Sequence, residues 1–209
     1  MDYFTAYQKM KKIVSKEKAR PVLQGIHHHR GNIIEATDSH RATRARVDGI
    51  NFEEHIVNPK TKEYIDGSFP NLDGLFEVDA DSIVYGVALS QNTLQSLKSL
   101  LKAGKSIGHT VVGIAEVSGT MSLTTLKNMY SNEEEDVNVH MSMTMKVASN
   151  NDEEAVIRYV DINHLIHATE LFSTQEGFTH MTIQEVGKVI YFSNTKGDLE
   201  HIILPKRKY

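Results

Sequence analysis

The sequence of 209 residues contains no cysteine. This absence excludes a disulfide framework and every zinc or iron–sulfur site built on thiolates, and it fits an intracellular protein. No apolar run approaches the roughly 18 residues that a membrane helix needs, and residues 1 to 4 lack the basic and then apolar pattern of a signal peptide. The sequence therefore predicts a soluble, cytoplasmic protein with no membrane segment.

The short motifs of common enzymes are also missing. There is no Gly-x-Ser-x-Gly elbow, no phosphate-binding glycine loop with a lysine, and no His-Glu-x-x-His. Asp38 precedes His40 by two residues, but an aspartate that forms a turn by bonding its own backbone explains this pair better than an acid/base pair does. We expect a protein that is not an enzyme and uses no cofactor.

A run of three histidines, His27 to His29, raises the question of a metal site. Neighbouring residues on a strand point to opposite faces of the sheet, so at most His27 and His29 share a side. The run holds neither a cysteine nor a well-placed carboxylate. The sequence therefore favours an ordinary strand with exposed imidazoles, and no metal is expected.

The chain carries no net positive charge, and its basic residues are unevenly distributed. The formal net charge is −4, which excludes a generally cationic nucleic-acid binder. Lysines nevertheless gather on two expected helices, one near the N-terminus and one near residue 100, while acidic runs occupy residues 133–136 and 152–154. A basic surface for DNA phosphates gives this distribution, and so does a solvated helix face.

The first half of the chain reads as one helix followed by short strands. Residues 4–18 show helical spacing of apolar residues, and Pro21 ends that pattern. A stretch rich in Gly, Pro, Asn and Asp, residues 66–81, predicts a domain boundary. Between them we expect strands at residues 22–29, 32–36 and 41–47, and a hairpin over residues 55–65 that turns at Asn58 and Pro59.

The second half repeats the order of helix, strands, helix, strands. We expect Ser90 to cap a leucine-striped helix that stops at Gly104, and Asp161 to cap a second helix. Residues 137–147 alternate between apolar and polar side chains with period two, which indicates a strand. Further strands are expected in a hairpin over residues 110–126 and at residues 155–160, 178–184, 188–193 and 198–204.

Three segments together resemble the bacterial DNA polymerase III β sliding clamp family. They are the polar turn at residues 36–42, the Gly-Ser-Phe-Pro connector at residues 67–73, and the tail Ile-Ile-Leu-Pro-Lys-Arg at residues 202–207, in the family's order. The resemblance implies an α+β, DNA-clamp-like fold of two domains, each with antiparallel sheets and with helices on one face. We expect a shortened domain at residues 1–77, which lacks a second helix, and a complete domain at residues 78–209.

In that family the three segments surround a groove that captures partner proteins. An apolar floor from Leu75, Ile203 and Leu204, with direction set by His40 and Arg41, suits a short extended segment with apolar anchors. Lys206 and Gly74 depart from the residues that the family prefers, which indicates a different partner preference. The resemblance implies the following groove residues: Thr37, Ser39, His40, Arg41, Ala42, Pro70, Leu75, Ile202, Ile203, Leu204, Pro205, Lys206 and Arg207.

The resemblance also implies a function: a DNA polymerase processivity factor that encircles double-stranded DNA without sequence preference. Clamp helices line the central hole with basic side chains that meet phosphates. Family rings hold six domains, so two per chain imply a homotrimer. The alternative is a regulatory module that closes no ring and binds or competes for clamp-binding proteins. The expected DNA-facing lysines, which a solvated helix face explains equally well, are Lys9, Lys12, Lys16, Lys98 and Lys102.

Overall fold

The protein divides into two compact units. The first comprises Met1–Val78 and Tyr191–Ile203, and the second comprises Asp79–Ile190 and Leu204–Tyr209. Both are built from antiparallel strands and a few helices, so the expected α+β class is confirmed. The structure, a computed structural model, describes residues 1–78, 83–87, 89–106, 108, 110–117, 119–125, 142–146, 148–149, 158–173, 179–183 and 189–206.

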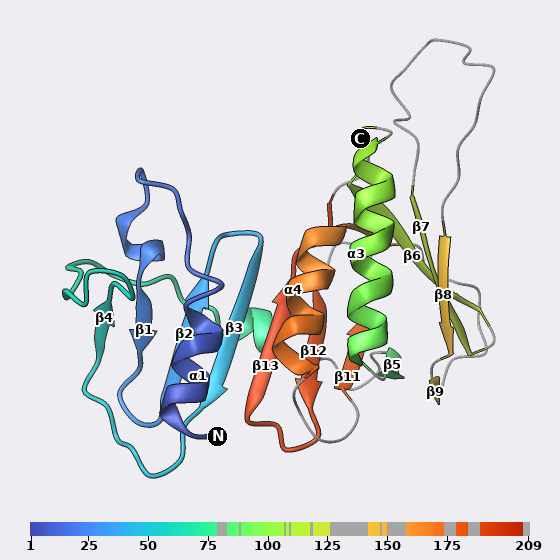
Figure 1. Cartoon of the computed structure of the whole chain (residues 1–209). Coiled ribbons are helices and arrows are strands. Elements are labelled where there is room, and N and C mark those ends of the chain that lie inside the picture. The colour runs from blue at the N-terminus through green and yellow to red at the C-terminus, as the bar shows by residue number, and fades with distance from the viewer. Residues whose placement is uncertain are drawn as a thin grey trace. The chain divides into compact units, whose positions relative to one another are not determined.

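The first unit is a twisted antiparallel sheet with the strand order β4-β1-β2-β3-β13-β12 (Figure 1). Its register places Glu35 opposite both His27 on β1 and Arg44 on β3, and it pairs Arg44 with Glu200 on β13. The elements are α1 (Tyr3–Met10), a 3₁₀ turn η1 (Pro21–Gln24), β1 (Ile26–His28), β2 (Ile33–Thr37), β3 (Arg41–Arg46), β4 (His55–Val57), α2 (Asp73–Phe76), β12 (Ile190–Asn194) and β13 (Leu199–Ile203).

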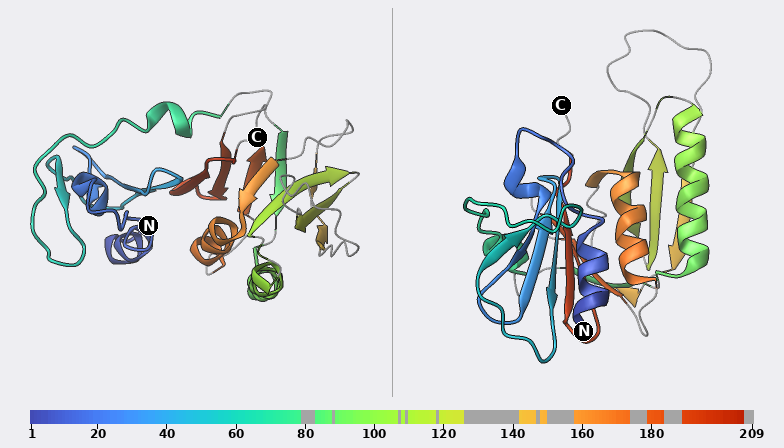
Figure 2. Two further views of the ribbon diagram at one scale, coloured as in Figure 1. Left: turned by 90° about the horizontal axis from the view of Figure 1, so that it is seen from above. Right: turned by 60° about the vertical axis from the view of Figure 1, so that its left-hand side comes forward.

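Helix α1 covers one face of this sheet, where it contacts β2 and β3. The Asp2 carboxylate caps the helix by accepting the Thr5 N–H at 2.9 Å. Ala6 and Met10 are fully buried together with Ile34 and other strand residues. The chain after β4 runs over the opposite face, where α2 contacts β13, as the left view of Figure 2 shows. The sheet is therefore covered on both faces.

The second unit holds two sheets and two longer helices. One sheet contains β11-β5-β9 and the other contains β10-β6-β7-β8. Val117 pairs with Thr120 across the β6–β7 hairpin, and Gly119 takes φ 74° in the turn, which confirms the hairpin expected there. The elements are β5 (Ile83–Val87), α3 (Gln91–Ser106), β6 (Val111–Val117), β7 (Thr120–Thr125), β8 (Ser142–Lys146), β9 (Ala148–Ser149), β10 (Arg158–Asp161), α4 (Ile162–Phe172) and β11 (Thr179–Ile183).

Helices α3 and α4 pack side by side on one side of the β10-β6-β7-β8 sheet (Figures 1 and 2). Ser90 caps α3 by accepting the Thr93 N–H at 3.2 Å, and Asp161 caps α4 by accepting the Asn163 N–H at 2.9 Å. Both expected caps are thus present. The facing stripes are apolar, and their buried residues are Leu94, Leu97, Leu100, Leu165, Ile166 and Phe172.

Several elements differ from the sequence-based expectation. The first helix ends at Met10 instead of residue 18, because buried Ile13 turns the chain inward and the Ser15 N–H donates to the Leu23 carbonyl at 2.8 Å. Residues 22–29 form η1 and then β1, not one strand. Strand β5 and the short helix α2 were not expected. Of the strand expected at 137–147, residues 137–141 and 147 lie outside the described residues.

The order of the elements along the chain does not show which of the two units the last strands belong to. The expected division was residues 1–77 and 78–209, yet Tyr191–Ile203 packs with the first unit. The cause is visible in the pairing of β13 with β3, where Ile202 lies opposite Ala42 and Ile203 opposite Arg41. Strands that are remote in sequence complete the first sheet by antiparallel pairing.

Candidate partner-binding groove and basic surface

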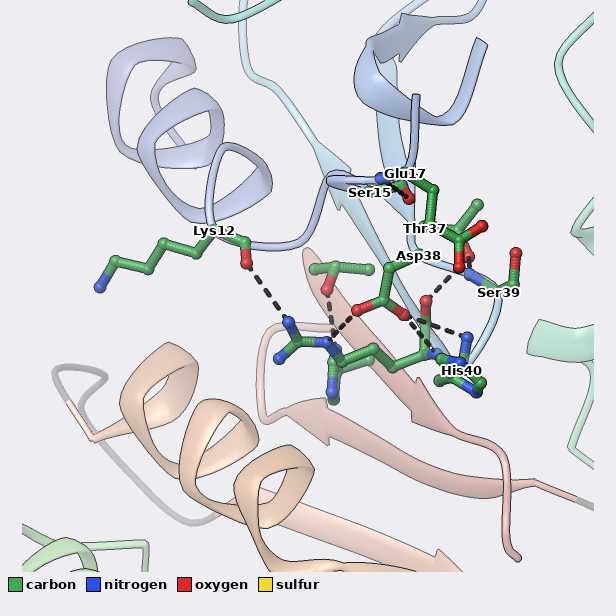
Figure 3. A network of polar contacts seen from close by, with 10 residues as sticks. Lys12, Ser15, Glu17, Thr37, Asp38, Ser39 and His40 are labelled. Atoms are coloured by element: carbon green, nitrogen blue, oxygen red, sulfur yellow. Dashed lines mark hydrogen bonds and ion pairs between the residues drawn. The ribbon is translucent and has the colours of Figure 1, made fainter. Parts of the chain in front are cut away.

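The turn between β2 and β3 is held by hydrogen bonds from its own side chains (Figure 3). The Asp38 carboxylate accepts the N–H groups of His40 and Arg41 at 3.0 and 3.1 Å, which is the turn-forming role expected for it. Thr37 Oγ1 donates to the Arg41 carbonyl at 2.8 Å and accepts the Ser39 N–H at 3.2 Å. Ser39 takes a left-handed φ of 73°. The conformation of the turn is therefore defined by side-chain hydrogen bonds within the turn itself.

Arg41 ties this turn to the segment after α1. Its Nε lies 2.9 Å from Asp38 Oδ2, and its Nη2 donates to the Lys12 carbonyl at 3.4 Å (Figure 3). The Arg41 side chain is buried, as are Thr37 and Ala42, whereas His40 is exposed. In this structure Arg41 braces the turn, and His40 is the residue of the turn that presents most surface to solvent.

The connector after β4 is anchored to the sheet by Arg44, a residue that the sequence analysis missed. Arg44 donates to Asp73 Oδ1 at 2.5 Å and lies 4.5 Å from the centre of the Phe76 ring. Phe76 is buried, while Leu75 between these two anchors is 36% exposed. Pro70 is exposed as well. One feature of the sequence could have indicated this role: Arg44 lies between the small strand residues Thr43 and Ala45, and a charged side chain on a buried strand needs a polar partner.

The C-terminal tail changes character after β13. Ile202 and Ile203 are buried in the first sheet, so their side chains offer almost no surface in this structure. Leu204, the next residue, is 37% exposed. Pro205 is half-buried, and Arg207 lies outside the described residues. An apolar side chain thus follows directly on the strand that pairs with the start of β3.

Lys206, which belongs to the second unit, contacts β10 of the same unit through both its backbone and its side chain. Its N–H donates to the Tyr159 carbonyl at 2.7 Å, and its Nζ lies 3.6 Å from Asp161 Oδ2. Burial raises the pKa of Asp161, but hydrogen bonds from Asn163 and the charge of Lys206 outweigh that effect and lower it. Lys206 therefore anchors the tail to β10, which its position in the sequence did not reveal.

The five lysines expected to face DNA do not form one equivalent row. Lys9 is only 8% exposed, and burial lowers its pKa, with a smaller effect from Lys12. Lys12 and Lys16 are exposed but lie beyond the end of α1, so they are not on a common helical face. On α3, Lys102 is exposed and Lys98 pairs with Glu170 of α4 at 3.1 Å. Lys12, Lys16 and Lys102 remain the candidates with exposed side chains and no ion pair to an acidic group in the described residues.

Solved structures of bacterial DNA polymerase III β subunits match this chain over almost its whole length. The fold is that of the bacterial sliding clamps, as the sequence resemblance indicated. The β subunit of Caulobacter crescentus matches with a TM-score of 0.77 at 15% identity, covering 98% of this chain and 64% of that one. The Eubacterium rectale protein, described as a proposed β subunit, matches with a TM-score of 0.78 at 10% identity, covering 98% of this chain and 63% of that one.

A further C. crescentus clamp structure has polyethylene glycol bound at a region proposed for tethering of a β-motif. It matches with a TM-score of 0.73 at 16% identity, covering 100% of this chain and 64% of that one. This chain therefore spans about 64% of the length of these clamps. No protein-family profile matches the sequence, and no curated protein does. Among the described residues, no helix is both long and apolar enough to cross a membrane.

Proposed function

We propose that this chain is a DNA polymerase processivity factor of the sliding-clamp type, which tethers a polymerase to DNA through a short peptide bound in a groove. The observation that carries the proposal is the match to β sliding clamps over 98% of the chain. At 15% identity this match concerns the fold, so the activity rests on the groove residues and their exposure. On this proposal the protein is a scaffold and not an enzyme.

Two residues that the resemblance assigns to the groove are exposed apolar side chains: Leu75 in the first unit is 36% exposed, and Leu204 in the second unit is 37% exposed. A partner peptide with apolar anchors gains most from burying such side chains against a surface that is already ordered. The turn braced by Asp38 and the connector held by Arg44 supply that order. Ile202 and Ile203, which the resemblance also assigns to the groove, are buried in the first sheet.

DNA would meet the exposed lysines through its phosphates. Such contacts carry no sequence information and permit sliding. Three copies of a chain with two clamp-like units would supply the six domains of a ring, and head-to-tail contacts that close by rotation give such a trimer. Lys12, Lys16 and Lys102 are then the expected contacts with DNA, and Lys9 is not one of them.

A second function is a clamp-like module that forms no ring and binds or competes for clamp-binding proteins. The observation that favours it is the loss of two of the five candidate DNA contacts. Lys9 is buried and Lys98 pairs with Glu170, so the basic surface is weaker than the sequence suggested. The first unit also has no helix longer than the eight residues of α1 within residues 1–78, all of which are described.

Peptide binding by matched variants tests the groove. A fluorescently labelled clamp-binding peptide of the polymerase type is titrated with the wild-type chain, Leu204→Ser and Ile50→Ser. Losing an apolar anchor costs about 2 kcal/mol, so Leu204→Ser should weaken binding about 30-fold. Ile50 is 37% exposed like Leu204 but lies outside the proposed groove, so Ile50→Ser should bind as the wild type does.

The two variants also separate a groove effect from a folding effect. Both replace a partly exposed apolar side chain, so both should unfold at the same denaturant concentration as the wild type within the usual error for surface changes. Equal peptide affinities for Leu204→Ser and the wild type would overturn the groove assignment. An equal loss in both variants would mean that the effect is not specific to the groove.

A further inference from the structure

The sheet register brings a carboxylate to the histidine run. Glu35 on β2 lies directly opposite His27 on β1, and residues opposite each other in an antiparallel pair project from the same face. His29 lies two residues after His27 and therefore on that face as well. The three side chains each offer one ligand atom, and these atoms lie within 4.8 Å of one another. This carboxylate could not be recognised from the sequence alone, because Glu35 is six residues beyond the run.

We propose that His27, His29 and Glu35 form a binding site for a first-row divalent metal ion such as Zn²⁺, with water in a fourth position. Two imidazole nitrogens and one carboxylate oxygen make a common ligand set for zinc, and tetrahedral coordination by three protein groups leaves one open position. The ion would link β1 to β2 near the edge of the first sheet. This inference does not depend on the proposed clamp function.

The state of His27 fits a ligand. The residue is 6% exposed, and its Nδ1 is buried with no hydrogen-bond partner in the structure. When the Nε2 proton is shared with Glu54 Oε1, 3.5 Å away, Nδ1 keeps the lone pair that a metal ion needs. A buried imidazole nitrogen without a partner is otherwise a cost to the fold.

On binding a metal ion, Glu35 and His29 would exchange their mutual hydrogen bond for bonds to the metal. His29 Nε2 lies 2.6 Å from Glu35 Oε2, and an ion between these atoms replaces that contact by two metal–ligand bonds. The other oxygen, Glu35 Oε1, accepts from Arg44 Nε at 2.5 Å and keeps this bond. Metal-bound carboxylates are usually oriented by such outer partners.

Two carboxylates besides Glu35 lie near the site. Glu54 contacts His27 and Asp73 contacts Arg44, and both are about two-thirds exposed, whereas Glu35 is fully buried. His27 and Glu54 also line an open surface pocket of about 530 Å³, which gives an ion a path from solvent.

Zinc titration of the tag-free, full-length chain tests the site. Calorimetry should show one Zn²⁺ bound per chain, and His29→Gln should weaken that binding at least about tenfold, because one of three protein ligands is lost. His180→Gln, a histidine on β11 in the other unit, is the matched control and should bind as the wild type does. Zn²⁺ should also raise the melting temperature of the wild type and of the control, but not that of His29→Gln.

Co²⁺ provides an independent readout of geometry. The wild type loaded with Co²⁺ should show the intense visible bands of a tetrahedral site, and His29→Gln should not. His29 is the residue to change, because its side chain is 31% exposed and its loss is tolerated more readily than that of Glu35, which is fully buried and paired with Arg44. Absence of one-to-one Zn²⁺ binding by the wild type, or equal affinity in His29→Gln, would overturn the proposal.

Discussion

Replacing Arg44 with methionine tests how the buried charges of the first unit are stabilised. Arg44 Nε bonds Glu35, a carboxylate with 0% exposure, and Nη2 bonds Asp73, which is largely exposed. Methionine keeps most of the side-chain volume and removes the charge. Removing one partner of a buried pair typically costs about 3 to 5 kcal/mol, because the other charge stays buried without compensation.

The loss of stability expected for Arg44→Met lies near the lower end of this range of about 3 to 5 kcal/mol, that is, about 3 kcal/mol. His29 Nε2 remains a hydrogen-bond partner of Glu35 at 2.6 Å, while the exposed pair with Asp73 adds at most about 1 kcal/mol. We therefore expect Arg44→Met to lower the free energy of unfolding by about 3 kcal/mol, measured by urea denaturation. Arg30→Met, at an exposed arginine in the β1–β2 turn, should change it by less than about 0.5 kcal/mol.

A double variant separates the charge effect from lost packing on Phe76. In Arg44→Met with Glu35→Gln the buried carboxylate is neutral, so at least half of the lost stability should return. A loss below about 1 kcal/mol in Arg44→Met, or no recovery in the double variant, would refute the reasoning.

Two further predictions concern pH and DNA. Burial, and to a smaller extent His55, lowers the pKa of His28 from 6.5 to about 4, so the unfolded chain binds a proton at this residue more readily than the folded chain does. The free energy of unfolding should therefore fall by up to about 3 kcal/mol as the pH is lowered from 6.5 to 4. Urea titrations at several pH values measure this dependence, and His28→Phe should lack it. Charge reversal at Lys12 and Lys16 should shorten the polymerase products on a primed template and leave the affinity for the peptide unchanged. Lys60→Glu, the control, should change neither the product length nor the peptide affinity. Lost peptide binding with unchanged product length in the Lys12 and Lys16 variant would contradict the assigned surfaces.

Local patterns predicted the elements that local chemistry controls. The caps at Ser90 and Asp161, the hairpin turn at Gly119, and the strands around the Thr37–Arg41 turn were all expected, each from a residue type with a defined backbone or hydrogen-bonding preference. The fold followed from these elements combined with the resemblance of three short segments to clamps.

Elements that depend on tertiary contacts were not predictable in the same way. The helical pattern of residues 4–18 is stopped at Met10 by burial of Ile13, which no propensity reports. Lys9 reads as a solvated lysine, yet the fold buries it. The contact of Glu35 with His29 needs the β1–β2 register, since the two residues are distant along an extended chain.

The mass of the protein in solution tests the clamp account most directly. A chain that spans about 64% of the length of known clamps can encircle DNA only by associating, so the account predicts a homotrimer of 23.5 kDa chains at micromolar concentration. Light scattering after size-exclusion chromatography, with and without a duplex oligonucleotide, gives this mass. A trimer whose mass increases with the duplex supports the encircling ring, whereas a monomer that the duplex leaves unchanged would contradict it.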